Sequence, residues 1–428
     1  MNYQESIDFL KSRTKFGINM GLSRIEELLR RLGNPHKKLQ YIHVTGTNGK
    51  GSTCAMIASV CKEAGYRTGF FSSPHLHSYI ERFRINGTEI SEKRLAEILT
   101  QIAPHLTAMH SEGWEDPTEF EISTAVALLY FAEEQVDMAV MEVGMGGSID
   151  STNVIDAKIA VITSVAMDHM SYLGNTIDEI AAVKAGIIKK GSAVFTACQN
   201  TPLAVIRSAA QNNQAQVFSS PEDFSFQLQS NTVDGQIFDF HGEGKSYYGI
   251  KLSLLGRHQL SNAALAISVC IYLGVEEAVI KKGIERAVWP ARLEIISSNP
   301  LILLDGAHNT EAFTALTAAL REYWSQKRIV AVLGMLDDKN RQEALSSILP
   351  CLAQAVITHP LSERASDWQY LATICEEAGV PSVREENINK ACEIAVSMVK
   401  ETDLLLVCGS FFLVAAAREY FFARDNKC

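Results

Sequence analysis

Hydrophobic and polar residues follow two alternating patterns along the first part of the chain. Short apolar runs bounded by glycine or polar residues predict buried strands at 41–44, 67–73, 137–144 and 157–165. Segments with the helical period lie before and between them, at 5–13, 22–33, 52–65 and in two parts of 91–134. This alternation of strands and helices favours a mostly parallel, doubly wound sheet.

The pattern changes twice farther along the chain. Between residues 224 and 250 polar and apolar residues alternate one by one, which predicts a small antiparallel sheet. A second strand–helix series begins near Leu301. We therefore expect an α/β protein of two domains. Residues 1–295 would form a doubly wound, P-loop ATPase-like domain with the small antiparallel sheet, and residues 296–428 a C-terminal Rossmann-like α/β domain.

Composition narrows the class of protein. The 428 residues are 47% hydrophobic and 21% charged, as in ordinary globular proteins, and the net charge of −10 argues against binding to nucleic acid or a membrane surface. Nine scattered cysteines without metal-binding spacing indicate reduced thiols, and the N-terminus lacks the apolar core of a signal peptide. The longest apolar stretch, 404–417, is shorter than the roughly 20 residues that span a bilayer, and it reads as a strand running into a helix. We expect a cytoplasmic protein.

A glycine-rich loop, HVTGTNGKGST at 43–53, lies between a predicted strand and a predicted helix. Glycines let backbone N–H groups turn toward phosphate, and the helix directs its positive dipole end to the same point. Lys50 would contact the β- and γ-phosphates, and the hydroxyls of Ser52 and Thr53 could reach magnesium or a phosphate oxygen. The residues expected to bind ATP here are Thr47, Asn48, Gly49, Lys50, Gly51, Ser52 and Thr53.

The loop departs from the standard P-loop pattern. That pattern requires glycine where this chain has Val44 and serine or threonine where it has Gly51. The alternative interpretation is a glycine-rich turn that binds nothing, although the flanking strand and helix favour a phosphate site. Glu142 adds a second feature, since it ends a predicted buried strand, where α/β sheets bind ligands. Its alternative role is to cap a neighbouring helix.

Nine segments together resemble one family. TGTNGKGS resembles the nucleotide loop of the folylpolyglutamate synthetase and dihydrofolate synthetase family, relatives of the Mur cell-wall ligases whose loop lacks the additional glycine at 51. The resemblance continues in order through FFSSPHL (70–76), ERFRINGTEIS (81–91), TEFEISTAVAL (118–128), MEVGMGGSIDSTN (141–153), DHMSYLGNTIDEIAAVKAGIIK (168–189), GRHQLSNAALA (256–266), WPARLE (289–294) and DGAHN (305–309). Two departures are Ala291, where the family commonly has glycine, and Ser151, where alanine is frequent.

The resemblance implies a set of metal and nucleotide residues. Ser73, Glu142 and His169 are implied as ligands of one or two magnesium ions, although magnesium prefers oxygen to a histidine nitrogen. Asn262, Arg292 and Asp305 are implied as nucleotide contacts, and His308 as a contact to the reacting phosphate. Standing alone, His308 could equally cap the following helix. Together with Lys50, these residues would neutralise and align two anionic reactants.

The remaining implied residues concern the acyl acceptor and a modified lysine. Lys184 corresponds to a lysine that the family carbamylates with CO₂, which needs a neutral, partly buried amine. A solvent-facing lysine on a helix is the alternative. Phe120 would stack near the pterin or simply pack in the core, Asp150 would contact the pterin or its loop, and Arg82 would bind substrate.

The resemblance implies an ATP-dependent amide ligase. ATP would phosphorylate a carboxylate, and the amine of L-glutamate would attack the acyl phosphate in a site between the two domains. The carboxylate would belong to dihydropteroate, to an existing glutamate of a folate, or to both in turn. The sequence does not define the preferred folate, the length of the polyglutamate or the oligomeric state, for which we expect a monomer.

Two alternative functions fit parts of this sequence. A Mur-type ligase of UDP-linked sugars would use a separate UDP-binding domain, whereas only about 40 residues precede the loop. A P-loop switch or kinase would form no amide, and it would not explain a second β/α domain or the set Glu142, His169 and Lys184.

Overall fold

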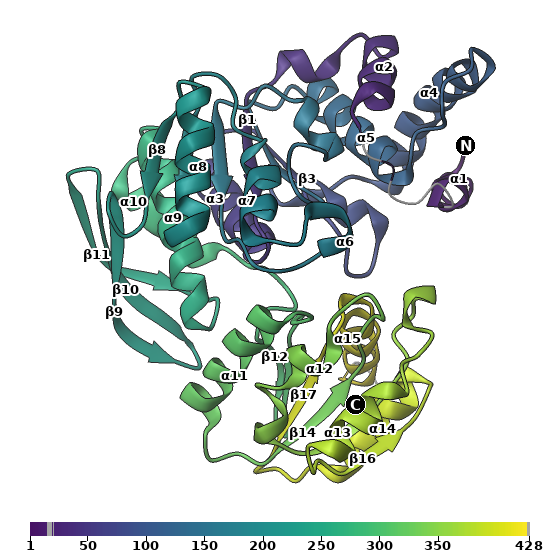
Figure 1. Cartoon of the computed structure of the whole chain (residues 1–428), viewed down its shortest axis with the longest axis vertical. Coiled ribbons are helices and arrows are strands. Elements are labelled where there is room, and N and C mark those ends of the chain that lie inside the picture. The colour runs from purple at the N-terminus through teal and green to yellow at the C-terminus, as the bar shows by residue number, and fades with distance from the viewer. Residues whose placement is uncertain (15–18, 20, 426–428) are drawn as a thin grey trace. The chain divides into compact units, whose positions relative to one another are not determined.

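A computed structural model of the chain describes residues 1–14, 19 and 21–425 (Figure 1). These residues form two compact units. The first comprises Met1–Gln229, Ile237–Leu252 and Leu260–Ala287, and the second comprises Ser230–Gln236, Ser253–Gln259 and the chain from Val288 onward. The units therefore interleave in sequence, and the single boundary at residue 295 stays a prediction.

The first unit contains an eight-stranded sheet in the order β4-β3-β2-β5-β1-β6-β7-β8. Neighbouring strands pair in parallel except at β3 and β4, which form an antiparallel edge. The strands are β1 (Tyr41–Thr45), β2 (Thr68–Phe71), β3 (Phe83–Ile85), β4 (Thr88–Glu89), β5 (Met138–Glu142), β6 (Ile159–Ile162), β7 (Ala193–Thr196) and β8 (Gln216–Ser219). The four expected strands are the central ones, β2, β5, β1 and β6.

Helices cover this sheet on both faces. Ala139 and Met141 of β5 share one apolar cluster with α2, α4 and α5, whereas α3 packs against the same strands outside that cluster. The doubly wound arrangement expected from the sequence is confirmed. The helices in this part of the chain are α1 (Tyr3–Arg13), α2 (Ser23–Arg31), α3 (Lys50–Glu63), α4 (Glu92–Ser111), α5 (Glu119–Glu133), α6 (Met170–Leu173), α7 (Ile177–Ala185), α8 (Asn200–Asn212), α9 (Arg257–Tyr272) and α10 (Glu277–Arg286), with 3₁₀ turns η2 (Pro35–Lys38), η3 (Tyr79–Arg82) and η4 (Ser151–Val154).

Three consecutive strands form the small sheet expected from the alternating pattern. They are β9 (Phe224–Thr232), β10 (Gly235–Gly242) and β11 (Lys245–Leu252), in the order β11-β10-β9. Connections of two residues join them, so the strands run antiparallel. Alternate residues, among them Phe238 and Phe240, are fully buried, which accounts for the period of two.

The second unit contains a six-stranded sheet in the order β12-β13-β17-β14-β15-β16. All pairs are parallel except β12 with β13, which confirms a Rossmann-like α/β domain. The elements are β12 (Glu294–Ser298), β13 (Leu301–Leu304), α11 (Thr310–Trp324), β14 (Ile329–Leu333), α12 (Arg341–Leu345), η5 (Leu349–Cys351), β15 (Leu352–Ile357), η6 (Glu363–Ala365), α13 (Tyr370–Glu377), β16 (Ser382–Arg384), α14 (Ile388–Met398), β17 (Leu404–Cys408) and α15 (Phe411–Asp425).

The apolar stretch at 404–417 is the central strand β17 followed by the start of α15, as the sequence predicts. Leu404, Leu406 and Cys408 of β17 are fully buried in the core of the second unit. A search of the described ranges finds no helix with the length and apolarity needed to cross a membrane.

Candidate active site

The glycine-rich loop joins β1 to α3 at the carboxyl end of the parallel strands. A Cβ on Gly46 would lie 1.9 Å from the Thr163 hydroxyl, so only glycine permits this approach of the loop to the residues after β6. The contact is reinforced by hydrogen bonds, because the Thr163 hydroxyl donates to the Asn48 carbonyl at 2.6 Å and Thr47 N–H donates to the Ser164 carbonyl at 2.8 Å. These contacts tie the loop to the segment that follows β6.

Lys50 lies at the first position of α3 and bends back over the loop. Its ammonium donates to the carbonyls of Gly46 and Thr47 at 2.9 and 3.1 Å. Gly49 precedes it with φ of 85°, a conformation that favours glycine. A cation and a helix N-terminus thus converge on the loop, which is the arrangement that binds phosphate. Ser52 and Thr53 follow on α3, and both residues are almost wholly buried beneath the loop.

Asn262 reaches the same loop from α9. A Cβ on Gly49 would lie 2.4 Å from its side-chain oxygen. The structure thus brings Asn262 beside the loop, although more than 200 residues separate it from Gly49. Its role as a nucleotide contact stays a prediction.

Glu142 ends β5 and is buried, with 4% of its surface exposed. Ser73 follows β2, the neighbouring parallel strand, and its N–H donates to the Glu142 carboxylate at 3.2 Å. The structure therefore brings together two of the three predicted magnesium ligands. The third, His169, directly precedes α6 with φ of 50°, and its backbone N–H donates to the Asp168 carboxylate at 2.8 Å.

The chemistry of these donors fits magnesium better than a transition metal. Among the residues that the structure describes, no three His, Cys, Asp or Glu side chains gather into a metal site. Magnesium commonly binds through one or two carboxylates and fills its other positions with water and phosphate. A buried carboxylate beside a serine and a phosphate-type loop meets that requirement.

Lys184 lies near the end of α7 and is buried, with 2% of its surface exposed. Burial, and next the nearby charge of Lys50, lower the pKa of Lys184 to about 7, while Asp168 and Asp150 oppose that change. The alternative of a solvent-facing lysine is therefore wrong. A large fraction of this amine is neutral near pH 7, which is the form that reacts with CO₂.

The loop after β5 is packed directly against the helix that carries Lys184. A Cβ on Gly147 would lie 2.6 Å from the Val183 carbonyl oxygen and 2.8 Å from that of Lys184. Ser148 N–H also donates to the Val183 carbonyl at 2.8 Å. The loop that follows Glu142 therefore sets the position of Lys184.

Asp150 closes this loop and is buried within a hydrogen-bonded chain. Its carboxylate accepts from Met145 N–H at 2.9 Å and from the Thr152 hydroxyl at 2.5 Å. That hydroxyl gives its proton to Asp150, so it accepts from Nε2 of His43 at 2.8 Å. Burial lowers the pKa of His43 to about 3, which keeps the ring neutral. This pairing of His43 and Thr152 was not predicted from the sequence. The one signal for it was a histidine within the apolar strand at 41–44.

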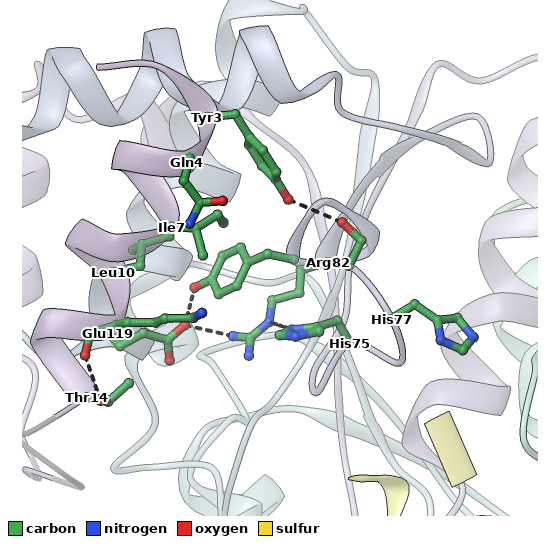
Figure 2. Close-up of a pocket in the computed structure, with 12 residues that line it drawn as sticks. Tyr3, Gln4, Ile7, Leu10, Thr14, His75, His77, Arg82 and Glu119 are labelled. Atoms are coloured by element: carbon green, nitrogen blue, oxygen red, sulfur yellow. Dashed lines mark hydrogen bonds and ion pairs between the residues drawn. The ribbon is translucent and has the colours of Figure 1, made fainter. Parts of the chain in front are cut away.

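Phe120 packs against the backbone beside Glu142. Its ring tip would lie 2.5 Å from a Cβ on Gly144, and its ring centre lies 5.9 Å from that of Phe71. Arg82, on the far side of the Ser73 loop, is buried and forms an ion pair with Glu119 at 3.1 Å (Figure 2). Phe120 thus packs against Gly144, two residues after Glu142, and the Arg82 carbonyl accepts at 3.1 Å from N–H of Ser72, the residue before Ser73. Their contact with substrate stays a prediction.

The predicted residues of the second unit form a cluster of their own. The Arg292 guanidinium lies over the Phe411 ring at 4.7 Å, and Nδ1 of His308 contacts the Gly306 carbonyl at 2.8 Å. Asp305 is buried, and its oxygens accept from Leu293 N–H at 2.9 Å and from Ala307 N–H at 2.8 Å. Asp305 thus fixes the backbone turn beside Arg292, and its role as a nucleotide contact stays a prediction.

Comparisons with known proteins agree with this geometry. Residues 44–270 match the Mur ligase middle domain, and residues 291–411 match the Mur ligase, glutamate ligase domain. A dihydrofolate synthase/folylpolyglutamate synthase of Bacillus subtilis (strain 168) is 38% identical over 429 residues, covering 97% of this chain and 98% of that protein. The chain belongs to the folylpolyglutamate synthase/dihydrofolate synthase family of Mur ligases.

Solved structures of this family share the fold over nearly the whole chain. Mycobacterium tuberculosis folylpolyglutamate synthase complexed with ADP has a TM-score of 0.92 at 33% identity, covering 98% of both chains. The complex of E. coli FolC with DHPP and ADP has a TM-score of 0.90 at 30% identity, covering 99% of both chains. Membership of a ligase family excludes the alternative of a nucleotide switch, and the names of these relatives favour folate over UDP-sugar substrates.

Proposed function

We propose that this chain is an ATP-dependent ligase that joins L-glutamate through an amide bond to a carboxylate of a folate, of dihydropteroate, or of both. The observation that carries the proposal is the convergence of three features in the first unit: the Lys50 loop, the buried Glu142 carboxylate and the buried Lys184 amine. Burial, and next the charge of Lys50, lower the pKa of Lys184, which supports one site that contains both the phosphate loop and the proposed carbamylated lysine.

The reaction proceeds in two steps, phosphorylation of the acceptor carboxylate and then formation of the amide bond. A carboxylate oxygen of the acceptor attacks the γ-phosphorus of ATP, which forms an acyl phosphate and releases ADP. The amine of glutamate then attacks the acyl carbon, phosphate leaves and the amine gives up a proton. Lys50 offsets the charge gathered on the γ-phosphate in the first step, and Arg292 and His308 are the further residues that we propose as phosphate contacts. Exclusion of water protects the acyl phosphate from hydrolysis.

Magnesium would be held by Glu142 and Ser73, with His169 as the further candidate, and would supply positive charge to the phosphates of ATP. Asn262 lies against the nucleotide loop at Gly49. The Asp305 carboxylate accepts from Leu293 N–H and so fixes the turn that carries Arg292. Phe120 and Asp150 line the acceptor side, where a flat pterin ring would pack. We infer that the enzyme works as a monomer, which sedimentation at assay concentration would test.

The acceptor carboxylate belongs either to dihydropteroate or to the terminal glutamate of a folate. Several relatives carry the names of both activities, which supports an enzyme with both. The test is glutamate-dependent ADP formation with dihydropteroate and with tetrahydrofolate in parallel. Turnover with both supports the dual enzyme, and turnover with one assigns the activity. ADP formation that ignores glutamate would contradict the proposed ligase.

Glu142→Gln is expected to lower the rate at saturating substrate by at least ~10²-fold, the scale for loss of a principal electrostatic contact. The change keeps the shape of the buried side chain and its contact with Ser73 N–H but removes the charge that would hold magnesium. The measurement is ADP formation over a magnesium titration. Full recovery of the rate at high magnesium would show that Glu142 contributes little to the chemistry.

Gly147→Ala is expected to lower the rate by about 10- to 100-fold, the range caused by misplacing catalytic groups by an ångström. The new methyl group would meet the carbonyl oxygens of Val183 and Lys184, which belong to backbone and cannot rotate away. Gly191→Ala is the control for a glycine-to-alanine change, because nothing lies within 4 Å of a Cβ there, although φ of 69° strains any side chain. A wild-type rate for Gly147→Ala, with an unchanged thermal transition, would show that the loop does not set Lys184.

A further inference from the structure

A cavity of about 450 Å³ opens in the first unit between α1 and the segment that ends in η3 (Figure 2). Helix α1 contributes apolar Ile7 and Leu10 together with the exposed cation Lys11. The opposite wall carries Tyr79 and Arg82. Neither Phe120 nor Asp150 lines it, so it is distinct from the proposed pterin contacts.

Arg82 is the polar group that this cavity exposes from a buried position. The residue is 8% exposed, its Nε donates to Nδ1 of His75 at 3.0 Å, and its Nη1 donates to Glu119 at 3.1 Å. The guanidinium also lies over the Tyr79 ring at 4.4 Å. Its Nη2 makes no hydrogen bond with any residue in the described ranges, although the same guanidinium is otherwise fixed on three sides. The two N–H donors of Nη2 therefore remain unused, on a guanidinium that its other contacts hold in place.

The charges around these donors favour an anion. Glu119 is the acidic residue lining the cavity, and its carboxylate already accepts from Arg82 and from the Tyr79 hydroxyl. Lys11 and His77 lie on the same walls. The Nη2 amino group can donate to a carboxylate oxygen through its unused N–H donors, and Lys11 supplies a second positive charge on the cavity wall.

The cavity is linked through the backbone to the proposed magnesium residues. The Arg82 carbonyl accepts from Ser72 N–H at 3.1 Å, and the next residue, Ser73, donates to Glu142 at 3.2 Å. Two hydrogen bonds and one peptide bond thus join the arginine to the buried carboxylate. A ligand whose reacting end lies at Glu142 would extend a second carboxylate toward this wall.

We propose that this cavity binds a carboxylate of a glutamyl residue already present on the acceptor, an inference that rests on the proposed function. Dihydropteroate has one carboxylate, and that carboxylate reacts. A folate carries an additional α-carboxylate for each glutamate, so only folate acceptors present an anion for Arg82 and Lys11. The cavity therefore favours glutamylated acceptors over dihydropteroate.

The test is calorimetric binding to the full chain with ADP and magnesium, using pteroate, pteroylmonoglutamate and pteroyl-tri-γ-glutamate. The wild type is expected to bind the triglutamate at least ~10-fold more tightly than pteroate, the scale of one charge-assisted contact. Arg82→Ala and Lys11→Ala are expected to reduce that ratio at least about threefold. Lys93→Ala, on the exposed face of α4 outside the cavity, is the control and should preserve the ratio.

The possible results of this binding experiment separate the inference about the cavity from the proposed ligase function. A wild-type ratio near one, or a ratio that neither variant changes, would overturn the inference while leaving the ligase intact. A second outcome would also overturn the inference: Arg82→Ala loses the same affinity for all three ligands, and Lys11→Ala loses none. Arg82 would then only stabilise the loop that carries it. Failure of the wild type to bind any pteroate would instead contradict the proposed function.

Discussion

Lys50→Ala should reduce glutamate-dependent ADP formation by at least ~10³-fold, because the change removes the point charge that faces the β- and γ-phosphates. The ammonium bends over the carbonyls of Gly46 and Thr47, so its loss removes little apolar packing and the fold should persist. The measurement is the initial rate of ADP release beside the thermal transition. Lys62→Ala, an exposed lysine on the same helix, is the matched control and should keep the wild-type rate.

An activity of Lys50→Ala within tenfold of the wild type would remove this residue from the phosphate site. A lowered thermal transition together with lost activity would be uninformative about charge, so Lys50→Met serves as the second variant. It retains the length of the side chain without its ammonium, and it should be as inactive as the alanine variant.

Lys184→Ala is expected to cause a loss of similar size, at least ~10³-fold, for a different reason. The neutral amine adds CO₂, a new N–C bond forms and one proton is released, so a cationic position becomes a carboxylate-like anion. That anion would lie beside Lys50, whose charge already acts on Lys184. A small carboxylate such as acetate, added at high concentration, is expected to restore part of the activity of the alanine variant.

Lys184→Arg distinguishes the carbamate from an ordinary phosphate-binding lysine. Arginine keeps the positive charge and cannot form the carbamate, so it should be as inactive as alanine. Partial activity of the arginine variant, combined with no response of the alanine variant to acetate, would mean that the positive charge is what the site uses.

The carbamate also predicts a dependence on pH and dissolved CO₂. The pKa of Lys184 is lowered from 10.5 to about 7, so the reactive neutral amine is lost as pH falls through 7 and dominates above it. At fixed low CO₂, wild-type activity should fall with this pH, and added bicarbonate should restore it most strongly near neutrality. An activity indifferent to CO₂ removal throughout this range would contradict the modification.

The sequence predicted those structural features that depend on a short-range pattern of residues. The β1–α3 loop, the strand ending at Glu142 and the second β/α series each have a short-range pattern of apolar residues and glycines. β7 and β8 were not predicted, because four-residue strands carry little periodic signal. The sequence left Lys184 open between a partly buried and a solvent-facing lysine, and its near-complete burial, beside the loop around Gly147, has no local pattern that reveals it.

Contacts between distant segments account for the remaining differences. Asn262 of α9 lies against Gly49, and Thr152 of η4 links His43 of β1 to Asp150, so both contacts join segments that are far apart in the sequence. The motifs identified which residues matter, whereas the tertiary structure defines how each is held.

Transfer of labelled oxygen tests the central claim most directly. The acceptor, dihydropteroate or tetrahydrofolate, would carry ¹⁸O in both oxygens of its reacting carboxylate and be incubated with ATP, magnesium and L-glutamate. An acyl phosphate requires one labelled oxygen to leave in the released phosphate for every amide bond formed. We predict phosphate containing a single ¹⁸O in a one-to-one ratio with the glutamylated product. Product formation with unlabelled phosphate, or ADP release without a new amide bond, would contradict the account.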